Sequence, residues 1–267
     1  MSRKAMKMTQ CIVVLSLAGV LGVWAAISAA AADLPADTAA QPTVSYAAKA
    51  IEAAAKNNKY LFIYFWRDDT QYSRVMRGVL QAAMKKMSDK AESVEVQTTD
   101  PAEQAIVTRY GVSRAPMPMV LALAPNGAIT KGLPTRFDES QLRQAFVSRC
   151  TAACMKALQE NKLVLLCVGR PTPQVRQVSL QRGVQEFATE EPYAKNSRVV
   201  ILNAGDPAEA PFLTSLQVDP QTPGPVTVLM APPGSVVGTF VGDVSKDELI
   251  AKLKSASSCG PGCSCHH

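Results

Sequence analysis

The last nine residues of the chain carry the densest group of possible metal ligands. They contain three thiols and two imidazoles, at Cys259, Cys263, Cys265, His266 and His267. Soft thiolates suit Cu(I) or Zn(II), and a loop of Gly, Ser and Pro can wrap one ion with three sulfurs and one imidazole. The Cys-x3-Cys spacing also permits a small disulfide loop, in which the odd thiol exchanges with a partner's disulfide. A tail without function is the third interpretation, and the sequence leaves all three open.

Three further cysteines fall where buried side chains are expected. Cys150 and Cys154 lie on an apolar stripe that repeats every fourth residue, and Cys167 lies inside the apolar run of residues 163–168. A free cysteine packs as a small hydrophobe, so core filling is the favoured interpretation for all three. A disulfide between two of them, or a metal pair at Cys150 and Cys154, is the alternative.

The chemistry of any folded site depends on residues 61–73, LFIYFWRDDTQYS. Residues 61–66 form a short apolar run, which is typical of a strand buried on both faces of a sheet. After a polar break, apolar residues fall three or four apart, which is typical of a helix over about residues 72–88. This apolar series is Val75, Met76, Val79, Leu80, Met84 and Met87. The segment therefore predicts a strand, a tight turn and a helix.

This segment resembles the active-site segment of the thioredoxin family, Phe-Trp-x-x-Trp-Cys-x-x-Cys. When that pattern is laid on Phe65 and Trp66, its two cysteines fall on Thr70 and Ser73. A hydroxyl can cap a helix, but it does not ionise at neutral pH and cannot exchange disulfides. A serine nucleophile would need a base, and the two histidines of the chain are its last two residues. The resemblance therefore implies a thioredoxin fold without a redox site at this turn.

Residues further along match the family as well. The matching positions are Tyr110, Gly111, Val112, Pro118, Asn126 and Gly127. In the family, the proline at this place is cis and precedes an apolar strand and an Asx-Gly turn. The segment before it is longer here than is usual, so Pro116 competes with Pro118 for the cis bond. Counting back from the Asn-Gly turn favours Pro118.

The same landmarks occur twice in one order. Residues 61–67 are echoed by residues 164–170, a shift of 103. Asp-Pro-Ala-Glu at 100–103 recurs at 206–209, a shift of 106, and PMVLALAPNG at 118–127 recurs as PVTVLMAPPG at 225–234, a shift of 107. Such collinearity indicates a duplicated unit. The second turn, residues 171–176, has no cysteine either, and a helix is predicted after it over about residues 174–187.

Residues 138–159 connect the two predicted units. Asp138 is a plausible N-cap with Gln141 at the capping-box position, and the apolar stripe continues from there to Leu158. One long helix and two helices placed end to end both fit this pattern. We therefore predict an α/β protein with two tandem thioredoxin-like three-layer α/β/α domains, over residues 33–147 and 148–256, followed by a flexible tail over residues 257–267.

The N-terminus has the pattern of a secretory signal peptide. Residues 1–32 combine a basic start, an uncharged apolar run and a small-residue cleavage signature, so a periplasmic or secreted protein is predicted. An uncleaved anchor is the alternative, because residues 12–32 are just long enough to cross a bilayer. Removing residues 1–32 takes away three positive charges and lowers the formal net charge from +6 to +3. That charge is too small and too scattered to indicate nucleic-acid binding, and a membrane is expected as a partner only if the anchor remains.

The sequence favours a non-catalytic binding or scaffold protein, with a protein or peptide as partner. Cysteine-free domains of the thioredoxin superfamily bind polypeptide beside the cis-proline, and the resemblance places that surface here at Trp66, Thr70, Tyr72, Ser73, Met117, Pro118 and Met119. Metal handling by the tail would add to this function. A thiol-disulfide oxidoreductase that uses Cys259, Cys263 and Cys265 is the alternative. No phosphate loop, dinucleotide fingerprint or paired-carboxylate site is visible in the sequence.

Overall fold

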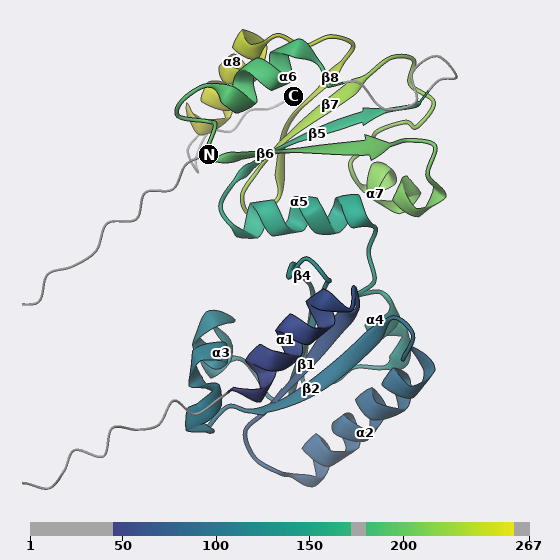
Figure 1. The fold of residues 1–267 in the computed structure, drawn as a ribbon, viewed down its shortest axis with the longest axis vertical. Coiled ribbons are helices and arrows are strands. Elements are labelled where there is room, and N and C mark those ends of the chain that lie inside the picture. Colours follow the sequence, from purple (N-terminus) through teal and green to yellow (C-terminus); the bar gives the residue numbers. More distant parts are fainter. Residues whose placement is uncertain (1–44, 172–179, 259–267) are drawn as a thin grey trace, which may run out of the picture. The chain divides into compact units, whose positions relative to one another are not determined.

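The computed structural model describes residues 45–171 and 180–258 (Figure 1). The predicted signal peptide of residues 1–32 and the tail ligands Cys259, Cys263, Cys265, His266 and His267 lie outside the described residues, as do residues 172–179 of the second turn. We call residues 45–147 the N-terminal half and residues 148–258 the C-terminal half.

The N-terminal half is built on one four-stranded sheet. Its elements are α1 (Tyr46–Lys56), β1 (Tyr60–Trp66), α2 (Gln71–Lys86), β2 (Ala91–Gln97), a 3-10 turn (Pro101–Glu103), α3 (Gln104–Arg109), a second 3-10 turn (Val112–Arg114), β3 (Met119–Leu123), β4 (Ile129–Pro134) and α4 (Glu139–Arg143). The strand order is β2-β1-β3-β4. β1 runs parallel to β2 and antiparallel to β3, and β3 forms a hairpin with β4. This connectivity is thioredoxin-like.

The C-terminal half repeats this connectivity. Its elements are α5 (Arg149–Gln159), β5 (Leu163–Gly169), α6 (Arg182–Thr189), β6 (Ser197–Asn203), a 3-10 turn (Pro207–Glu209), α7 (Ala210–Ser215), β7 (Val226–Ala231), β8 (Ser235–Val241) and α8 (Lys246–Ser258). The strand order is β6-β5-β7-β8, with β5 parallel to β6 and antiparallel to β7. The chain is therefore a mixed α/β protein with two four-stranded sheets of the same topology, as the sequence predicts.

The central strands β1 and β5 supply the cores on both faces of their sheets. Each has five consecutive buried residues, which confirms the prediction for residues 61–66. Phe62 and Tyr64 face a cluster with residues of α2 and α4, whereas Ile63 and Phe65 face one with residues of α1 and α3. The sheet thus lies between two helical layers in this half (Figure 1).

A buried glutamate explains the repeated Asp-Pro-Ala-Glu motif. The carboxylate of Glu103 accepts hydrogen bonds from the Ser45 hydroxyl and from the backbone N–H groups of Tyr46 and Ala47, at 2.6, 2.7 and 3.2 Å. Glu209 accepts in the same way from the Ser148 hydroxyl and the Cys150 N–H. The first helix of each half therefore begins on a buried carboxylate from the motif, which satisfies donors that a helix N-terminus leaves free.

Residues 138–159 form two helices. Asp138 and Gln141 make the predicted capping box at the start of α4. That helix ends at Arg143, and α5 begins anew because the Ser148 side chain accepts from the N–H of Thr151. The apolar stripe continues across this break, so the stripe alone does not reveal it.

Two predictions made from the sequence need correction. Val75 belongs to the apolar series predicted for α2, yet its side chain is 56% exposed. The series covers a wider arc than the face of α2 that packs on the sheet. The helix expected over residues 174–187 begins, within the described residues, only at Arg182.

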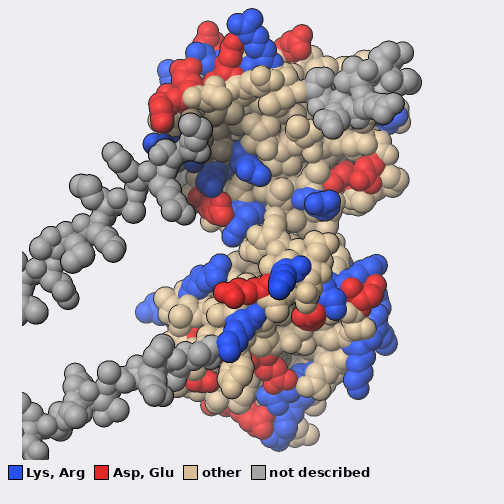
Figure 2. Space-filling view, in the orientation of Figure 1, with Lys and Arg blue, Asp and Glu red and all other residues tan. Residues whose placement is uncertain are grey.

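Charges of both signs are interspersed on the face drawn in Figure 2.

Within residues 45–171 and 180–258, every helix is too short or too polar to cross a bilayer.

Candidate functional site

The turn between β1 and α2 holds two hydrogen-bonded hydroxyls at the positions where the resemblance to the thioredoxin family places the cysteines of its motif. Thr70 caps α2, because its hydroxyl oxygen accepts from the Ser73 N–H at 3.1 Å. The two hydroxyl oxygens are 3.0 Å apart, and the buried Ser73 hydroxyl donates to the Asp68 carbonyl at 2.9 Å. Both side chains therefore act as capping and turn groups, as the sequence predicts. Among the described residues, their hydrogen bonds are with each other and with the backbone of this turn.

The carboxylate of Asp69, next to this turn, forms ion pairs with two arginines. Asp69 lies 3.0 Å from an Arg74 nitrogen and 3.3 Å from an Arg77 nitrogen. The Arg74 hydrogen bond, helped by Arg77, holds the pKa of the Asp69 carboxyl below its usual value, so this exposed group stays ionised at neutral pH. It is suited to fixing the arginines rather than to accepting a proton.

Trp66 ends β1 beside the cis-proline. Continuing the register of Phe65 with Met119 places Trp66 opposite Pro118. The Met117–Pro118 peptide bond is cis, so the sequence-based choice of Pro118 over Pro116 is confirmed. The Arg77 guanidinium lies 5.1 Å from the centre of the Trp66 ring, within the range of a cation–π contact. One face of this half-buried ring is therefore in contact with Arg77.

The seven residues predicted for the binding surface divide between the two faces of the sheet. Trp66 packs against the core cluster on the α2 side, and Thr70, Tyr72 and Ser73 lie at the start of α2. Met117 and Met119 pack against the cluster on the α1 and α3 side. Pro118 is buried. The first four residues therefore lie on the α2 side of the sheet, whereas the two methionines pack on its other side.

A groove beside α2 contains residues that the sequence did not single out for binding. It has a volume of about 710 Å³ and is lined by Tyr72, Val75, Met76, Val79, Arg136, Phe137, Asp138, Glu139 and Gln141. Tyr72 is 45% exposed and Val75 is 56% exposed. The signal available in the sequence was the unusual width of the apolar series in α2. Arg136 could not be assigned to this groove from the sequence, because only the fold brings the segment between β4 and α4 beside α2.

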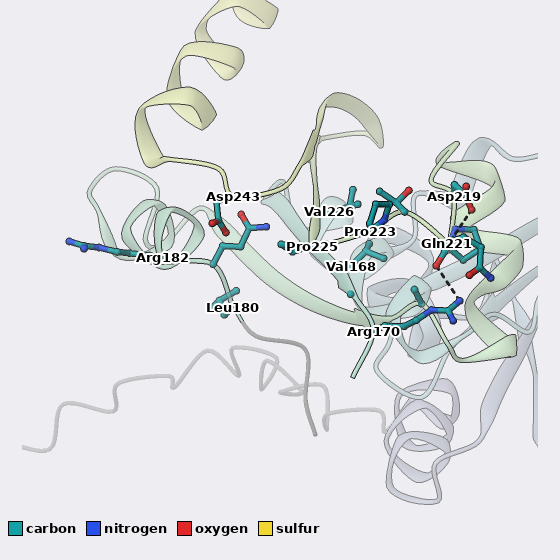
Figure 3. A pocket seen from close by; sticks show the side chains of 16 residues that line it. Val168, Arg170, Leu180, Arg182, Asp219, Gln221, Pro223, Pro225, Val226 and Asp243 are labelled. Carbon is teal, nitrogen blue, oxygen red and sulfur yellow. Dashed lines mark hydrogen bonds between the residues drawn. The ribbon is translucent and has the colours of Figure 1, made fainter. Parts of the chain in front are cut away.

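The C-terminal half has a cavity at the corresponding corner. Gly169 ends β5 as Trp66 ends β1, and the register of Val168 with Val226 places Gly169 opposite Pro225. With a glycine at the position of the tryptophan, the corner contains a cavity of about 650 Å³, drawn in Figure 3. Val168, Leu180 and Val226 supply apolar lining. This cavity, unlike the groove beside α2, lies at the end of a central strand.

The next residue makes an equivalent contact in both halves. The Arg67 guanidinium donates to the Ser113 carbonyl at 3.1 Å, and the Arg170 guanidinium donates to the Pro220 carbonyl at 3.2 Å (Figure 3). Each arginine thus ties the turn after the central strand to the loop that leads into the third strand. Because it is used in this way, Arg170 is a positioning group at the rim of the cavity.

The three cysteines among the described residues are free thiols. Cys154 and Cys167 are buried, as predicted, whereas Cys150 is partly exposed and its sulfur contacts the Ile201 carbonyl. Desolvation, and then the neighbouring Glu209, raises the pKa of Cys150 to about 12. Desolvation also raises the pKa of Cys154 to about 12 and that of Cys167 to about 11. These thiols are therefore protonated at neutral pH, and residues 45–171 and 180–258 contain no cluster of three or more metal-ligating side chains.

No protein-family model matches the chain, and no curated protein matches it. Among solved structures, it is similar to Deadhead, a germline-specific thioredoxin of Drosophila melanogaster, with 22% identity, a TM-score of 0.30, and coverage of 36% of this chain and 85% of that one. It is also similar to thioredoxin O2 of Arabidopsis thaliana in its oxidised state, with 14% identity, a TM-score of 0.31, and coverage of 38% and 84%. Oxidised thioredoxin of Plasmodium falciparum gives 12% identity, a TM-score of 0.30, and coverage of 36% and 86%. The thioredoxin-like fold of this chain rests on the strand order and connectivity of its two sheets.

Proposed function

We propose that this protein is an exported, non-catalytic binding or scaffold protein with two tandem thioredoxin-like domains, which holds extended polypeptide at the β1–α2 corner. The observation that supports this most is the hydroxyl pair of Thr70 and Ser73, whose oxygens are 3.0 Å apart. Disulfide exchange needs a thiolate at the helix N-terminus and a second thiol that resolves the mixed disulfide. Hydroxyls that cap a helix do neither, so binding is the function that this corner retains.

The groove beside α2 supports a peptide as the partner. Tyr72 and Val75 offer exposed apolar surface, while the charged residues on its wall are Arg136, Asp138 and Glu139, of which Glu139 is already paired with Lys86 and Arg143. An aromatic and an aliphatic side chain beside a wall that carries both charges suit an extended segment with apolar side chains. The partner is therefore an unfolded or partly folded polypeptide rather than a charged ligand.

The test is suppression of aggregation of a reduced, unfolded client protein by the mature chain. The double variant Tyr72→Ala/Val75→Ser removes the exposed apolar surface and should lose most of the suppression. Ile201→Ser is the matched control, because Ile201 is 48% exposed but lies on β6 of the other sheet. Trp66→Ala and Met117→Ala, tested singly, show which face of the sheet contributes. If the double variant protects the client as well as the unmodified chain does, the groove is not the binding site.

The tail adds a second proposed activity, which rests on the sequence alone. Cys259, Cys263, Cys265, His266 and His267 would hold Cu(I) or Zn(II), with the folded halves as carrier. Metal content per chain, with and without residues 257–267, tests this proposal, and equal negligible metal in both would end it. An insulin-reduction assay separates the alternative of thiol exchange, because replacing the three tail cysteines by serine should then abolish activity. Peptide holding should survive both changes.

Export is part of the proposal because residues 1–32 have the pattern of a signal peptide. The exported chain would act in a compartment where thiols oxidise. The mass of the protein isolated from its native compartment distinguishes cleavage after residue 32 from an uncleaved anchor.

A further inference from the structure

The edge strand β8 is the least protected edge in the part of the chain that the structure describes. The two sheets have four edge strands, which are β2, β4, β6 and β8. A bare edge pairs readily with another strand, and charged side chains or proline normally prevent this. β2 carries Glu92 and Glu95, β4 carries Lys131 and Pro134, and β6 carries Arg198. β8 reads SVVGTFV and has neither a charge nor a proline. Its pairing with β7 is irregular at Val237, where the register shifts, and regular over residues 238–241.

The outer side of β8 offers both backbone and apolar surface. The Gly242 N–H donates to the Pro225 carbonyl at 2.9 Å, so the alternation of an antiparallel pair turns the N–H and C=O of Thr239 and Val241 away from β7. Val241 is 65% exposed and Val236 is 46% exposed. The strand can therefore accept a neighbour through its backbone and cover apolar side chains at the same time.

The strand is complementary to a second copy of itself. An antiparallel pair centred on Thr239 sets Thr239 against the partner's Thr239 and Val237 against the partner's Val241. It also sets Gly238 against the partner's Phe240, where Lys252 and Phe240 of the same copy already cover the glycine. No like charges meet, because the strand is uncharged. An extended peptide with a charged side chain at these positions would lack this match.

We propose that two copies of this chain associate through antiparallel pairing of β8, about a two-fold axis at Thr239, into one continuous eight-stranded sheet. Such an interface is isologous and closes at two copies. A single strand pair buries less area than a standard stable interface, so the dimer belongs to the weak, reversible class. Self-association would thus use one edge strand, β8, of the sheet in the C-terminal half.

Sedimentation equilibrium of the mature chain in reducing buffer, over about a hundredfold range of concentration, tests this proposal. The mass should rise from monomer toward dimer. Thr239→Lys and Thr239→Glu each set like charges opposite one another, so each should raise the dissociation constant about tenfold or more. An equimolar mixture of the two variants pairs opposite charges and should restore the dimer. Ile201→Lys, which adds the same charge to the opposite edge, should leave the dissociation constant unchanged.

Three results would overturn the proposal. The first is a mature chain that stays monomeric over the whole range. The second is a Thr239→Lys variant that dimerises as the unmodified chain does, which would place the interface elsewhere. The third is a Lys and Glu mixture that associates no better than either variant alone, which would exclude the register centred on Thr239. Circular dichroism of each variant establishes that the fold is intact.

Discussion

The carboxylate of Glu103 lies 2.6 Å from the hydroxyl of Ser45, although the two residues are 58 positions apart in the chain. It also accepts from the first N–H groups of α1, so one buried side chain fixes the start of the helix that covers one face of the first sheet. Glu209 has the same relationship to Ser148 in the second sheet. The repeated motif is therefore an anchor for a helix and not a trace of a lost active site.

Glu103→Ala should lower the free energy of unfolding by about 2 to 3 kcal/mol, because buried N–H donors at the start of α1 lose their acceptor. Urea unfolding followed by circular dichroism measures the change. Glu52→Ala is the control, since Glu52 is an exposed glutamate in α1 itself, and it should change stability by less than about 0.5 kcal/mol. Equal effects of the two substitutions would show that Glu103 does not anchor the helix.

Thr70→Cys/Ser73→Cys should create a reactive thiol pair at the start of α2. The two hydroxyl oxygens are already 3.0 Å apart, and a helix N-terminus lowers the pKa of a thiol placed there. After oxidation, thiol titration of the double variant should show two fewer thiols than before, and insulin reduction should appear. The single variants are the controls, because neither can resolve a mixed disulfide. A double variant that fails to oxidise would contradict the assigned geometry of this turn.

The thiols of Cys150, Cys154 and Cys167 should resist alkylation in the folded protein. An ordinary thiol is about half ionised at pH 8.5, whereas burial raises the pKa of Cys150 and Cys154 to about 12 and leaves about one molecule in 3,000 as thiolate. Iodoacetamide labelling at pH 8.5, read by mass spectrometry with the tail cysteines replaced by serine, should be at least about a hundredfold slower than in unfolded protein. Labelling of Cys154 at the unfolded rate would contradict its burial.

The same pKa shifts predict how stability changes with pH. The thiol of Cys154 ionises near pH 8.5 when unfolded and near pH 12 when folded, so the unfolded state binds fewer protons between these values. The free energy of unfolding should therefore fall as pH rises through this range. The fall should be shallower in Cys154→Ala, because one of the thiols responsible is absent.

The order of strands and helices along the chain could be predicted from the sequence, because burial patterns and turn residues are local signals. The capping roles of Thr70 and Ser73 followed from their place at the start of the predicted helix, whereas the cis bond at Pro118 followed from the resemblance to the thioredoxin family. The Glu103–Ser45 contact could not be predicted, because it joins residues far apart in the chain. The exposure of Val75 depends on which part of α2 the sheet covers, and the cavity beside Gly169 depends on the register of β5 with β7.

Two helical glycines should respond in opposite ways to replacement by alanine. A Cβ atom on Gly183 of α6 would lie 2.0 Å from the Val244 carbonyl oxygen, which is backbone and cannot swing aside. The Val244 N–H is also bonded to the Gln181 side chain at 3.0 Å, so Gly183→Ala would have to push apart the segments that this bond joins. It should cost about 3 kcal/mol. A Cβ atom on Gly78 of α2 meets nothing within 4 Å, so Gly78→Ala should gain about 0.5 to 1 kcal/mol from helix propensity. Urea unfolding of both variants measures the difference, and a neutral Gly183→Ala would show that α6 does not approach Val244 this closely.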